Sequence, residues 1–333
     1  MKKNLLITGA SGFIGSYLVE LALKKNYQTV AAVRPTSNKQ WLKDPSIHFL
    51  ELDFKNDQSL DHAISEFIER FGQIDYVIHN AGVTRANKNE EYDLVNCDNT
   101  IRLVHALQRN NQVPDKFVLI SSLAAYGPAP NEAPVKTSDF KAPLTAYGRS
   151  KHKAEEFLYS LSDFPFVIIN PTAVYGPKDK DVFFLINSIQ KGFEVYIGNK
   201  QQMLSFVHAE DLAAAIFLAM ESEVVRKNFL VSDQQVYTSH AFNQQIKTLL
   251  QKKTLSIVMP VLVVRTVAIF AEMVGSVTGK VPILNRERLK EFEAPNWAVD
   301  CSEIDQLGYQ PKYNLEEGLH DAIKWYKEQG WLS

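Results

Sequence analysis

The sequence predicts an α/β fold with a doubly wound parallel sheet and a smaller, mixed C-terminal substrate lobe. Short apolar runs alternate with helical patterns over 1–170, and this rhythm breaks beyond residue 170. A cluster of glycines directly follows the first apolar run. Nearly continuous apolar strands separated by helices are typical of a parallel sheet covered on both faces. We therefore expect a dinucleotide-binding domain over 1–170 and a mainly substrate-binding lobe over 171–333.

Six strands are expected in the first domain, because six short runs are apolar and rich in β-branched residues. They are residues 4–8, 29–33, 47–52, 74–79, 116–122 and 166–170. The segment 59–71 between two of these runs is predicted to be a helix. Its Leu60, Ile64 and Phe67 recur at helical spacing and form one apolar stripe.

The second half of the chain is expected to return in part to the first sheet. A strand-like run at 229–232 lies within a segment, 205–235, that we expect to rejoin it. The last helix of the chain is predicted from its apolar face, which carries Leu315, Leu319 and Ile323.

The most apolar segment of the chain is 257–275. It is interrupted by Pro260, Arg265 and Glu272, whereas a membrane-spanning helix needs about 20 consecutive, predominantly apolar residues. We therefore predict no membrane span. The residues leave open whether this segment belongs to the core, to a dimer face or to a lipid-facing surface.

The net charge and the cysteine content limit the kinds of partner the protein could bind and the compartment in which it is expected. A net charge of -2 offers no basic surface for nucleic acid. Cys97 and Cys301 are far apart and in no metal-binding spacing, so we expect neither a metal site nor a disulfide framework. This cysteine usage indicates a reducing compartment. The first apolar run is too short for a signal peptide, so we predict a cytoplasmic location.

The stretch TGASGFIG (8–15) follows the first strand and opens the first helix. In this setting the first glycine allows a tight turn, the second lets the backbone approach a pyrophosphate, and the third lets helix and strand pack closely. The helix N-terminus adds N–H groups and partial positive charge for the phosphates. We assign this loop to a dinucleotide bound by a Rossmann fold, through Gly9, Ser11, Gly12, Phe13, Ile14 and Gly15.

The residue after the second strand indicates which dinucleotide binds. NAD sites carry Asp or Glu there to hold the ribose 2′-hydroxyl. This chain has Arg34, and a guanidinium suits a 2′-phosphate, so NADP is favoured. NAD stays the alternative if Arg34 is only a solvated cation. Asp53 and Phe54, at the end of the third strand, are expected near adenine, although Asp53 could equally be a helix N-cap or turn residue.

The stretch AYGRSK (146–151) places the phenol of Tyr147 four residues before the ammonium group of Lys151, on one helical face. A free tyrosine has a pKa near 10, too high for proton exchange at pH 7. The lysine cation and the positive nicotinamide of an oxidised cofactor both favour phenolate. A serine from 120–127, at the carboxyl end of the fifth strand, can bind the substrate oxygen. This set suits hydride transfer with proton exchange and needs no metal.

Together, these motifs resemble the short-chain dehydrogenase/reductase superfamily, in its extended, NAD-dependent epimerase/dehydratase-like branch. The matching stretches are TGASGFIG, LDF near residue 53, HNAG (79–82), VNCDNT (95–100), SSLAAYG, YGRSK, NPTAVYGP (170–177) and FVHAEDLA (206–213). The resemblance implies that Tyr147 is the catalytic tyrosine and that Lys151 also binds the nicotinamide ribose. It implies Ser122 as the catalytic serine, with Ser121 as the alternative.

The same resemblance extends to the cofactor site and to assembly. It implies that Ala81 and Gly82 lie along the cofactor and that Pro171 lies by the nicotinamide amide. Asn96 would be structural. Members of the superfamily often dimerise through helices beside the active site, so a homodimer is expected.

Departures from the family pattern reduce the number of reactions that this chain is expected to catalyse. Dehydratases of the superfamily carry an Asp-Glu pair directly after the active Ser or Thr, where this chain has Leu123 and Ala124, so we exclude a dehydratase. Epimerases usually carry an acidic residue where this chain has Arg34, and no basic cluster for a diphosphate is evident in the second lobe. The apolar segment 257–275 is similar to members that act on hydroxysteroids or flavonoid-like ketones.

We therefore predict an NADP-dependent oxidoreductase that interconverts a secondary alcohol and a ketone on a small, apolar substrate. The alternative is a nucleotide-sugar epimerase that holds NAD tightly. A nicotinamide-sensing or scaffold protein with a degenerate site is a third reading. It is disfavoured because Tyr147 and Lys151 are both present.

Overall fold

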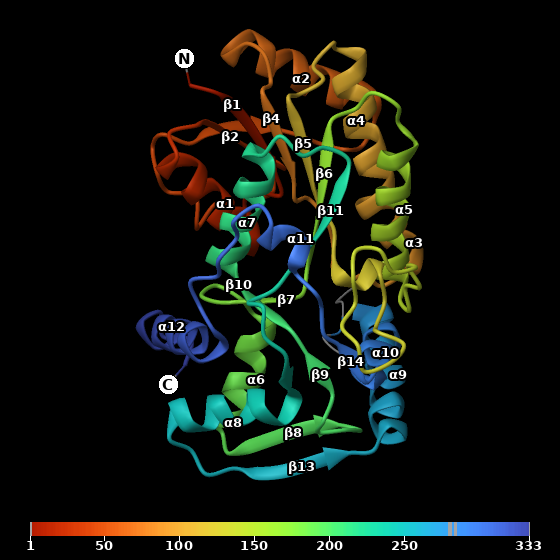
Figure 1. Ribbon diagram of the computed structural model, residues 1–333, viewed down its shortest axis with the longest axis vertical. Coiled ribbons are helices and arrows are strands. Elements are labelled where there is room, and N and C mark those ends of the chain that lie inside the picture. The colour runs from red at the N-terminus through yellow and green to blue at the C-terminus, as the bar shows by residue number, and fades with distance from the viewer. Residues whose placement is uncertain (1, 279–281, 283–284, 333) are drawn as a thin grey trace.

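A seven-stranded parallel sheet forms one end of the molecule and a smaller lobe forms the other (Figure 1). This computed structural model describes residues 2–278, 282 and 285–332. The strand order is β3-β2-β1-β4-β5-β6-β11. The bounds are β1 Asn4–Thr8, β2 Gln28–Val33, β3 His48–Glu51, β4 Tyr76–His79, β5 Lys116–Ile120, β6 Phe166–Pro171 and β11 Lys227–Val231. The order reverses between β1 and β4, where ligands bind in such sheets, so the predicted doubly wound fold is confirmed.

The last strand of this sheet comes from the second half of the chain. β11 pairs with β6 in parallel, with Lys227 opposite Val167 and Val231 opposite Pro171. Pro171 therefore lies at the carboxyl end of β6, the same edge at which the glycine loop leaves β1. The division of the chain at 170/171 stays a prediction.

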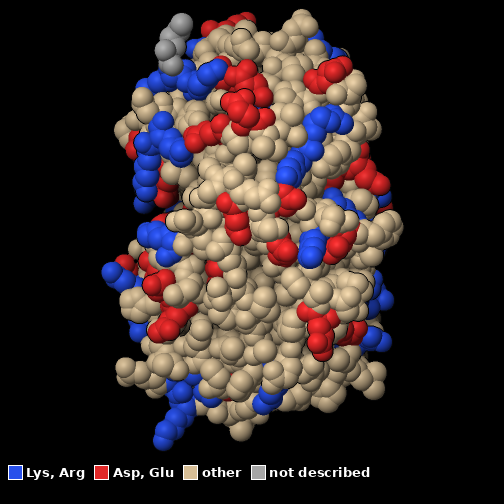
Figure 2. Space-filling model, in the orientation of Figure 1, with Lys and Arg blue, Asp and Glu red and all other residues tan. Residues whose placement is uncertain are grey.

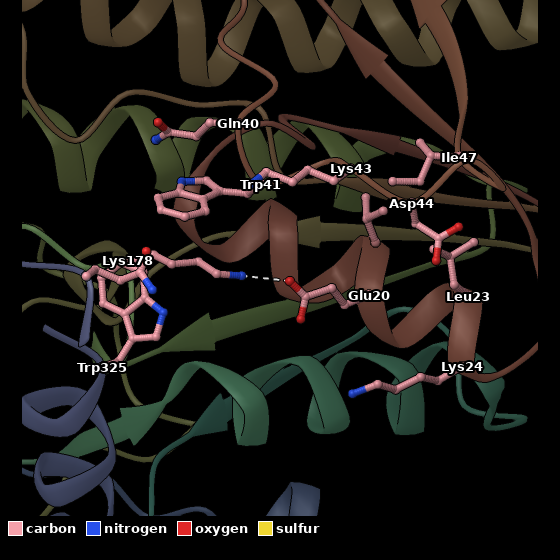
Figure 3. A pocket seen from close by; sticks show the side chains of 12 residues that line it. Glu20, Leu23, Lys24, Gln40, Trp41, Lys43, Asp44, Ile47, Lys178 and Trp325 are labelled. Atoms are coloured by element: carbon pink, nitrogen blue, oxygen red, sulfur yellow. Dashed lines mark hydrogen bonds and ion pairs between the residues drawn. The ribbon is translucent and has the colours of Figure 1, made fainter.

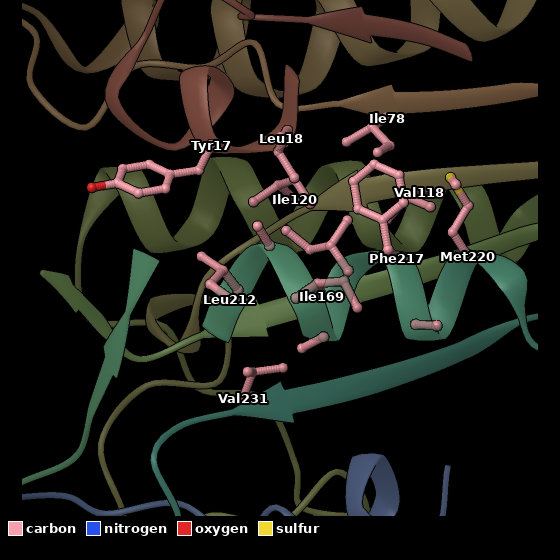
Figure 4. Packing of buried hydrophobic residues seen from close by; sticks show 14 of the residues in the cluster. Tyr17, Leu18, Ile78, Val118, Ile120, Ile169, Leu212, Phe217, Met220 and Val231 are labelled. Carbon is pink, nitrogen blue, oxygen red and sulfur yellow. The ribbon is translucent and has the colours of Figure 1, made fainter. Parts of the chain in front are cut away.

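Helices cover both faces of the sheet, because β1 and its neighbours send alternate apolar side chains to opposite sides. One face carries α1 (Phe13–Lys24) and α7 (Ala209–Glu221), and the other carries α2 (Asp57–Phe71), α4 (Asn99–Arg109) and α5 (Ala146–Ser160). On the first face Leu18 of α1 and Phe217 of α7 meet Ile120 of β5 in one core (Figure 4). On the second face the predicted stripe of α2 is buried, including Leu60 and Phe67.

The C-terminal lobe has a core of its own. Its helices are α6 Asp181–Gln190, α8 Ser239–Leu250, α9 Val261–Thr278, α10 Arg286–Glu293, α11 Ser302–Asp305 and α12 Leu315–Glu328. Its strands are β7 Ala173–Tyr175, β8 Phe193–Ile197, β9 Met203–Leu204, β10 Phe206–His208, β12 Tyr237–Thr238, β13 Leu255–Met259 and β14 Asn296–Trp297. As predicted, Leu315, Leu319 and Ile323 are buried on one face of α12, in a cluster with Phe242 and Ile246 of α8.

Two segments differ from their predicted form. The strand expected over 116–122 ends at Ile120, because the Ser122 hydroxyl accepts a hydrogen bond from the Ala124 N–H (3.1 Å) and starts a 3₁₀ helix, Leu123–Ala125. The apolar segment 257–275 is divided by Pro260 into β13 and α9. Among the described residues, no helix has the length and hydropathy needed to cross a membrane.

Candidate active site

The loop between β1 and α1 has the geometry of a phosphate cradle. Gly9 has a φ of +64°, and a Cβ there would lie 2.8 Å from the backbone nitrogen of Ala81. A Cβ on Gly15 would lie only 2.1 Å from the Gly9 carbonyl oxygen. At Gly12, which is exposed, the nearest atom to a Cβ would be 3.3 Å away, and no side chain caps α1. The N–H groups of the first turn are therefore available to a pyrophosphate, and Ser11, Phe13 and Ile14 are partly exposed around them.

Two alanine substitutions test whether Gly15 has a structural role while Gly12 has the expected role of facing the dinucleotide. Gly15→Ala is expected to destabilise the fold by at least about 3 kcal/mol, because its methyl group overlaps a backbone carbonyl. Gly12→Ala, at a φ of −78° that alanine adopts, should unfold at nearly the wild-type temperature but bind dinucleotide more weakly. Thermal unfolding and titration with NADP and NAD measure both effects. Equal losses of stability in the two variants would contradict this assignment.

The residues assigned to the adenosine end lie just after β2 and β3. Arg34 is exposed directly after β2, and its backbone N–H donates to the Ser37 hydroxyl at 3.0 Å. Asp53 forms a turn, because one carboxylate oxygen accepts from the Lys55 N–H (3.2 Å) and the other lies 3.0 Å from Lys55 Nζ. The N-cap of α2 is Asn56. Of the two structural alternatives for Asp53, the turn is correct and the helix cap is wrong.

A buried histidine ties β1 to its neighbours behind the cofactor loop. His79 Nδ1 lies 2.8 Å from Thr8 Oγ1, and its Nε2 lies 3.1 Å from Thr100 Oγ1. Burial lowers the pKa of His79 to about 3, so the ring is neutral and structural. Thr8 Oγ1 also accepts a hydrogen bond from the Ala81 N–H at 3.1 Å. This bond fixes the backbone at Ala81, the first of the two residues expected to lie along the cofactor. The Phe54 ring lies 6.1 Å from His79, in the same layer.

Gly82 faces helix α5, which carries Tyr147 and Lys151. A Cβ on Gly82 would lie 2.9 Å from Asn96 Oδ1 and 3.1 Å from Lys151 Nζ. Asn96 sits in a π-helical turn, Asp93–Asp98, and its side chain is held by the backbone of Val83 at 2.8 and 3.0 Å. Only glycine therefore leaves the space beside Lys151 open, which suits the passage of a flat cofactor.

Helix α5 presents the phenol and the ammonium group together. Tyr147 lies in its first turn and Lys151 lies one turn later on the same face. The Tyr147 hydroxyl is hydrogen-bonded to Ser122 at the end of β5. Lys151 is buried, and its Nζ donates to the Ile120 carbonyl at 2.8 Å. Three residues predicted from sequence to act together are thus brought together from two neighbouring elements.

The two adjacent serines have different surroundings. Ser121 is buried and its hydroxyl donates to the Glu155 carboxylate, away from Tyr147. Ser122 is partly exposed and contacts the Tyr147 hydroxyl. The geometry therefore favours Ser122 over Ser121 as the group that meets a substrate oxygen.

Burial shifts the pKa values of the two titrating groups in opposite directions, each in favour of the uncharged form. It raises the pKa of Tyr147 to about 12, and the hydrogen bond from Ser122 opposes this rise. It lowers the pKa of Lys151 to about 8, and the charge of Glu155 opposes this fall. At pH 7 the protein alone therefore holds a neutral phenol beside a lysine that is still mostly cationic. A positive nicotinamide at this site would favour the phenolate.

A buried polar network under the site was not expected from the sequence. Glu155, one turn after Lys151, is 1% exposed and binds Lys141 and Ser121. Asn170 Nδ2 donates to Glu155 at 2.6 Å and to the Ser122 carbonyl at 3.1 Å, so the network fixes the backbone at Ser122. The i, i+4 spacing of Glu155 from Lys151 was the available signal, because it places both on one helical face.

Helix α10 adds charged groups beside α5 that sequence reasoning also missed. Glu287 accepts from the Ala146 N–H at 2.6 Å, next to Tyr147. Arg288 and Arg85 both bind Asp181, with Arg288 at 2.6 Å. The expectation that the second lobe has no basic cluster for a diphosphate stays a prediction, because Arg85 belongs to the first domain and both arginines pair with Asp181. Arg85 and Arg288 lie about 200 residues apart in sequence, so no local pattern indicated their meeting.

A cavity of about 450 Å³ on the outer side of α1 is separate from the site formed by Ser122, Tyr147 and Lys151 (Figure 3). It is lined by Trp41, Trp325 and the ion pair between Lys178 and Glu20, which are 2.7 Å apart. None of its lining residues belongs to the predicted catalytic or cofactor set. Within the described residues, no group of three or more His, Cys, Asp or Glu side chains could hold a metal ion.

Known proteins resemble this chain along its whole length. UDP-glucose 4-epimerase of Vibrio cholerae is 29% identical over 97% of this chain and 95% of its own. Ceramide reductase of Caulobacter vibrioides is 23% identical, over 98% and 95%. Sterol-4-alpha-carboxylate 3-dehydrogenase of Dictyostelium discoideum is 25% identical, over 96% and 99%.

Solved structures share the fold. UDP-glucose 4-epimerase of Thermotoga maritima, solved with UDP-glucose, superposes with a TM-score of 0.81 at 19% identity and covers 98% of this chain and 99% of its own. The dTDP-glucose 4,6-dehydratase of Bacillus anthracis, solved with NAD, has a TM-score of 0.78 at 19% identity, over 99% and 98%.

The model of one family, described as the NAD dependent epimerase/dehydratase family, matches residues 5–231. That span is more than half of the chain, and it includes the glycine loop, Ser122, Tyr147, Lys151 and the seven strands of the parallel sheet except for Asn4, the first residue of β1. The chain therefore belongs to the NAD dependent epimerase/dehydratase family, within the extended short-chain dehydrogenase/reductase superfamily.

Proposed function

We propose that this protein is an NADP-dependent oxidoreductase that interconverts a secondary alcohol and a ketone. The observation that carries this proposal is Arg34, an exposed cation at the position after β2 where NAD sites place a carboxylate. Among the described contacts no carboxylate pairs with its guanidinium, so it is available to a 2′-phosphate. An exchangeable NADP suits net oxidation or reduction better than internal recycling.

The residues of the site divide the chemistry between them. A bound nicotinamide would supply the hydride donor or acceptor. Tyr147 would give a proton to the substrate oxygen during reduction, or take it during oxidation, and Ser122 would bind the same oxygen. Lys151 would bind the ribose and favour the phenolate by its charge. The backbone at Gly82 and Pro171 would flank the nicotinamide end, while Gly9, Gly12 and Gly15 would form the pyrophosphate turn.

The proposed substrate is apolar. Two of the relatives are named for action on ceramide and on a sterol carboxylate, which are lipids. Leu123 and Ala124 follow Ser122 as buried apolar residues, so they bring no carboxylate for elimination of water. This supports oxidoreduction of an alcohol or ketone and opposes a dehydratase.

A nucleotide-sugar 4-epimerase with tightly held NAD is the second candidate. The observation that favours it is the relative from Vibrio cholerae at 29% identity, together with Arg85 and Arg288 beside the site. Arginine side chains of this kind can bind a diphosphate.

The nucleotide that the purified protein carries distinguishes the two. We expect NADP that dialyses away, or an empty site that binds NADP at least about tenfold more tightly than NAD. Arg34→Asp should weaken NADP binding about 100-fold and leave NAD binding unchanged or improved. Lys24→Asp, which makes the same charge change at an exposed position of α1, is the control. Mass spectrometry that finds one equivalent of NAD held per chain would instead support the epimerase.

A further inference from the structure

The two-stranded parallel sheet of β8 and β13 leaves one apolar face uncovered. Glu194 and Tyr196 of β8 are buried on the lobe side, while Phe193 and Val195 between them are 48% and 37% exposed. In the register of the pair, Leu255 lies opposite Phe193, Ile257 opposite Val195 and Met259 opposite Ile197. Both strands therefore present apolar side chains outward. Parallel sheets are normally covered on both faces, so this one lacks a cover.

Helix α9 continues this surface directly from the end of β13. A Cβ on Gly198, after β8, would lie 3.2 Å from Val261 at the start of α9, so the strand pair and the helix are contiguous. Among the side chains of α9 whose burial the structure describes, Val264 and Ala268 are buried, whereas Leu262 is 73% exposed and Phe270 is 61% exposed. In this set, more apolar residues are exposed than buried. The exposed ones are Leu262, Val263, Val267, Ile269, Phe270, Met273 and Val274. We refer to these residues, with Phe193, Val195, Ile197, Leu255, Ile257 and Met259, as the apolar end face.

Cations outnumber carboxylates around the apolar end face. The segments 191–200 and 247–274 contain six cations and two carboxylates, in a chain whose net charge is -2. Glu194 is 2% exposed and paired with Lys247 at 3.1 Å, and Glu272 is paired with Arg286 at 2.7 Å, so both carboxylates already have a partner within the chain. Along the bottom of Figure 2, where β8 and β13 lie, the surface is uncharged or basic and no acidic patch is seen. The cations are Lys191, Lys200, Lys247, Lys252, Lys253 and Arg265.

We propose that the apolar end face docks on the surface of a membrane that contains anionic phospholipid. Apolar side chains would enter the boundary of the acyl chains while the surrounding lysines meet the lipid phosphates, which is how interfacial elements bind without crossing the bilayer. A second copy of the chain fits less well. A two-fold contact would bring the same basic segments of both copies into one interface, and the two carboxylates of these segments, Glu194 and Glu272, are already paired within their own chain.

The docked surface lies one helix from the catalytic residues. Glu272 of α9 accepts from Arg286 of α10 at 2.7 Å, and Arg265 of α9 pairs with Glu293 of α10 at 3.1 Å. Glu287 of α10 in turn holds the N-terminus of α5 beside Tyr147. Docking would therefore bring the substrate side of the site close to the bilayer, although the docking itself does not depend on the proposed reaction.

The test is sedimentation of the whole protein with vesicles of phosphatidylcholine, with and without about a third phosphatidylglycerol. We expect binding to the mixed vesicles, weaker binding to pure phosphatidylcholine, and loss of binding as salt rises. Val195→Asp should weaken binding about tenfold or more. Its matched control is Val113→Asp, because Val113 is 42% exposed but precedes β5 at the opposite end of the sheet domain.

A second variant tests the charges without touching the apolar side chains. Lys252→Glu/Lys253→Glu should reduce binding to mixed vesicles at least about 20-fold and leave the unfolding temperature unchanged, since both lysines are exposed. The control is Lys2→Glu/Lys24→Glu, which changes the net charge by the same amount at two exposed positions outside the apolar end face. Wild-type binding by Val195→Asp, or equal losses in the control variants, would overturn the proposal. The proposal would also be overturned if the wild-type protein did not bind vesicles but formed an oligomer, and if Val195→Asp dissociated that oligomer.

Discussion

Tyr147→Phe is expected to lower kcat about 1,000-fold while changing the Kd for the dinucleotide less than about threefold. The hydroxyl is the only atom group removed, and it is the group hydrogen-bonded to Ser122. The ring remains in its contact with Tyr92, whose centroid is 6.2 Å away, so the pocket keeps its shape. Such a loss corresponds to about 4 kcal/mol of transition-state stabilisation. Turnover of alcohols and ketones, with nucleotide titration beside it, measures both quantities.

A second tyrosine supplies the control for this prediction. Tyr126 follows Ser122 by four residues, and its hydroxyl donates to the Thr137 carbonyl at 3.3 Å, away from Tyr147. Tyr126→Phe should keep its turnover and lose about 1 kcal/mol of stability, from one buried hydrogen bond. If Tyr147→Phe turned over at a rate near that of Tyr126→Phe, the proposed role of the phenol would be wrong.

The parts of the fold that could be predicted from the sequence depend on short-range patterns. Each strand of the sheet is a local apolar run, and the distinct roles of Gly9, Gly12 and Gly15 follow from their spacing after β1. The pairing of Tyr147 with Lys151 likewise needs only helical periodicity. Even β11, which joins the sheet late, was recognisable as a strand because its own residues are apolar.

The parts that could not be predicted depend on contacts between distant segments. The bonds from Glu155 to Lys141 and Asn170 require the fold to place β6 and the loop before α5 together. The approach of Arg288 to Asp181 requires α10 to lie beside α6. The apolar segment 257–275 was recognised, but its exposure follows from the absence, in the described chain, of any element over the outer face of β13 and over the side of α9 that α10 leaves open. Apolar periodicity shows that a surface needs a partner and does not show whether the chain itself supplies one.

Lys151→Met is expected to remove activity and, unusually for a site variant, to raise stability at pH 7. Burial holds the pKa of Lys151 at about 8, below the 10.5 of an exposed lysine, so its charge costs the folded state about 3 kcal/mol. Methionine has a similar shape and no charge to desolvate. Its substitution leaves the Ile120 carbonyl without the 2.8 Å hydrogen bond, at a cost of about 1 kcal/mol. The net expected gain is about 2 kcal/mol.

The dependence on pH gives this prediction a second readout. Because the folded pKa lies below the unfolded one, the unfolded chain binds more protons between about pH 8 and 10.5. This lysine therefore makes the wild type gain stability as pH rises through that window, and the Lys151→Met variant should lack this contribution. Lys153→Met, at an exposed site paired with Asp93 at 2.7 Å on the same helix, should lose at most about 1 kcal/mol and stay active. Denaturant unfolding of the three proteins at pH 7 and pH 10 measures the difference. A Lys151→Met protein less stable than wild type at pH 7 would mean that the buried ammonium group is satisfied by its surroundings and helps to hold the site together.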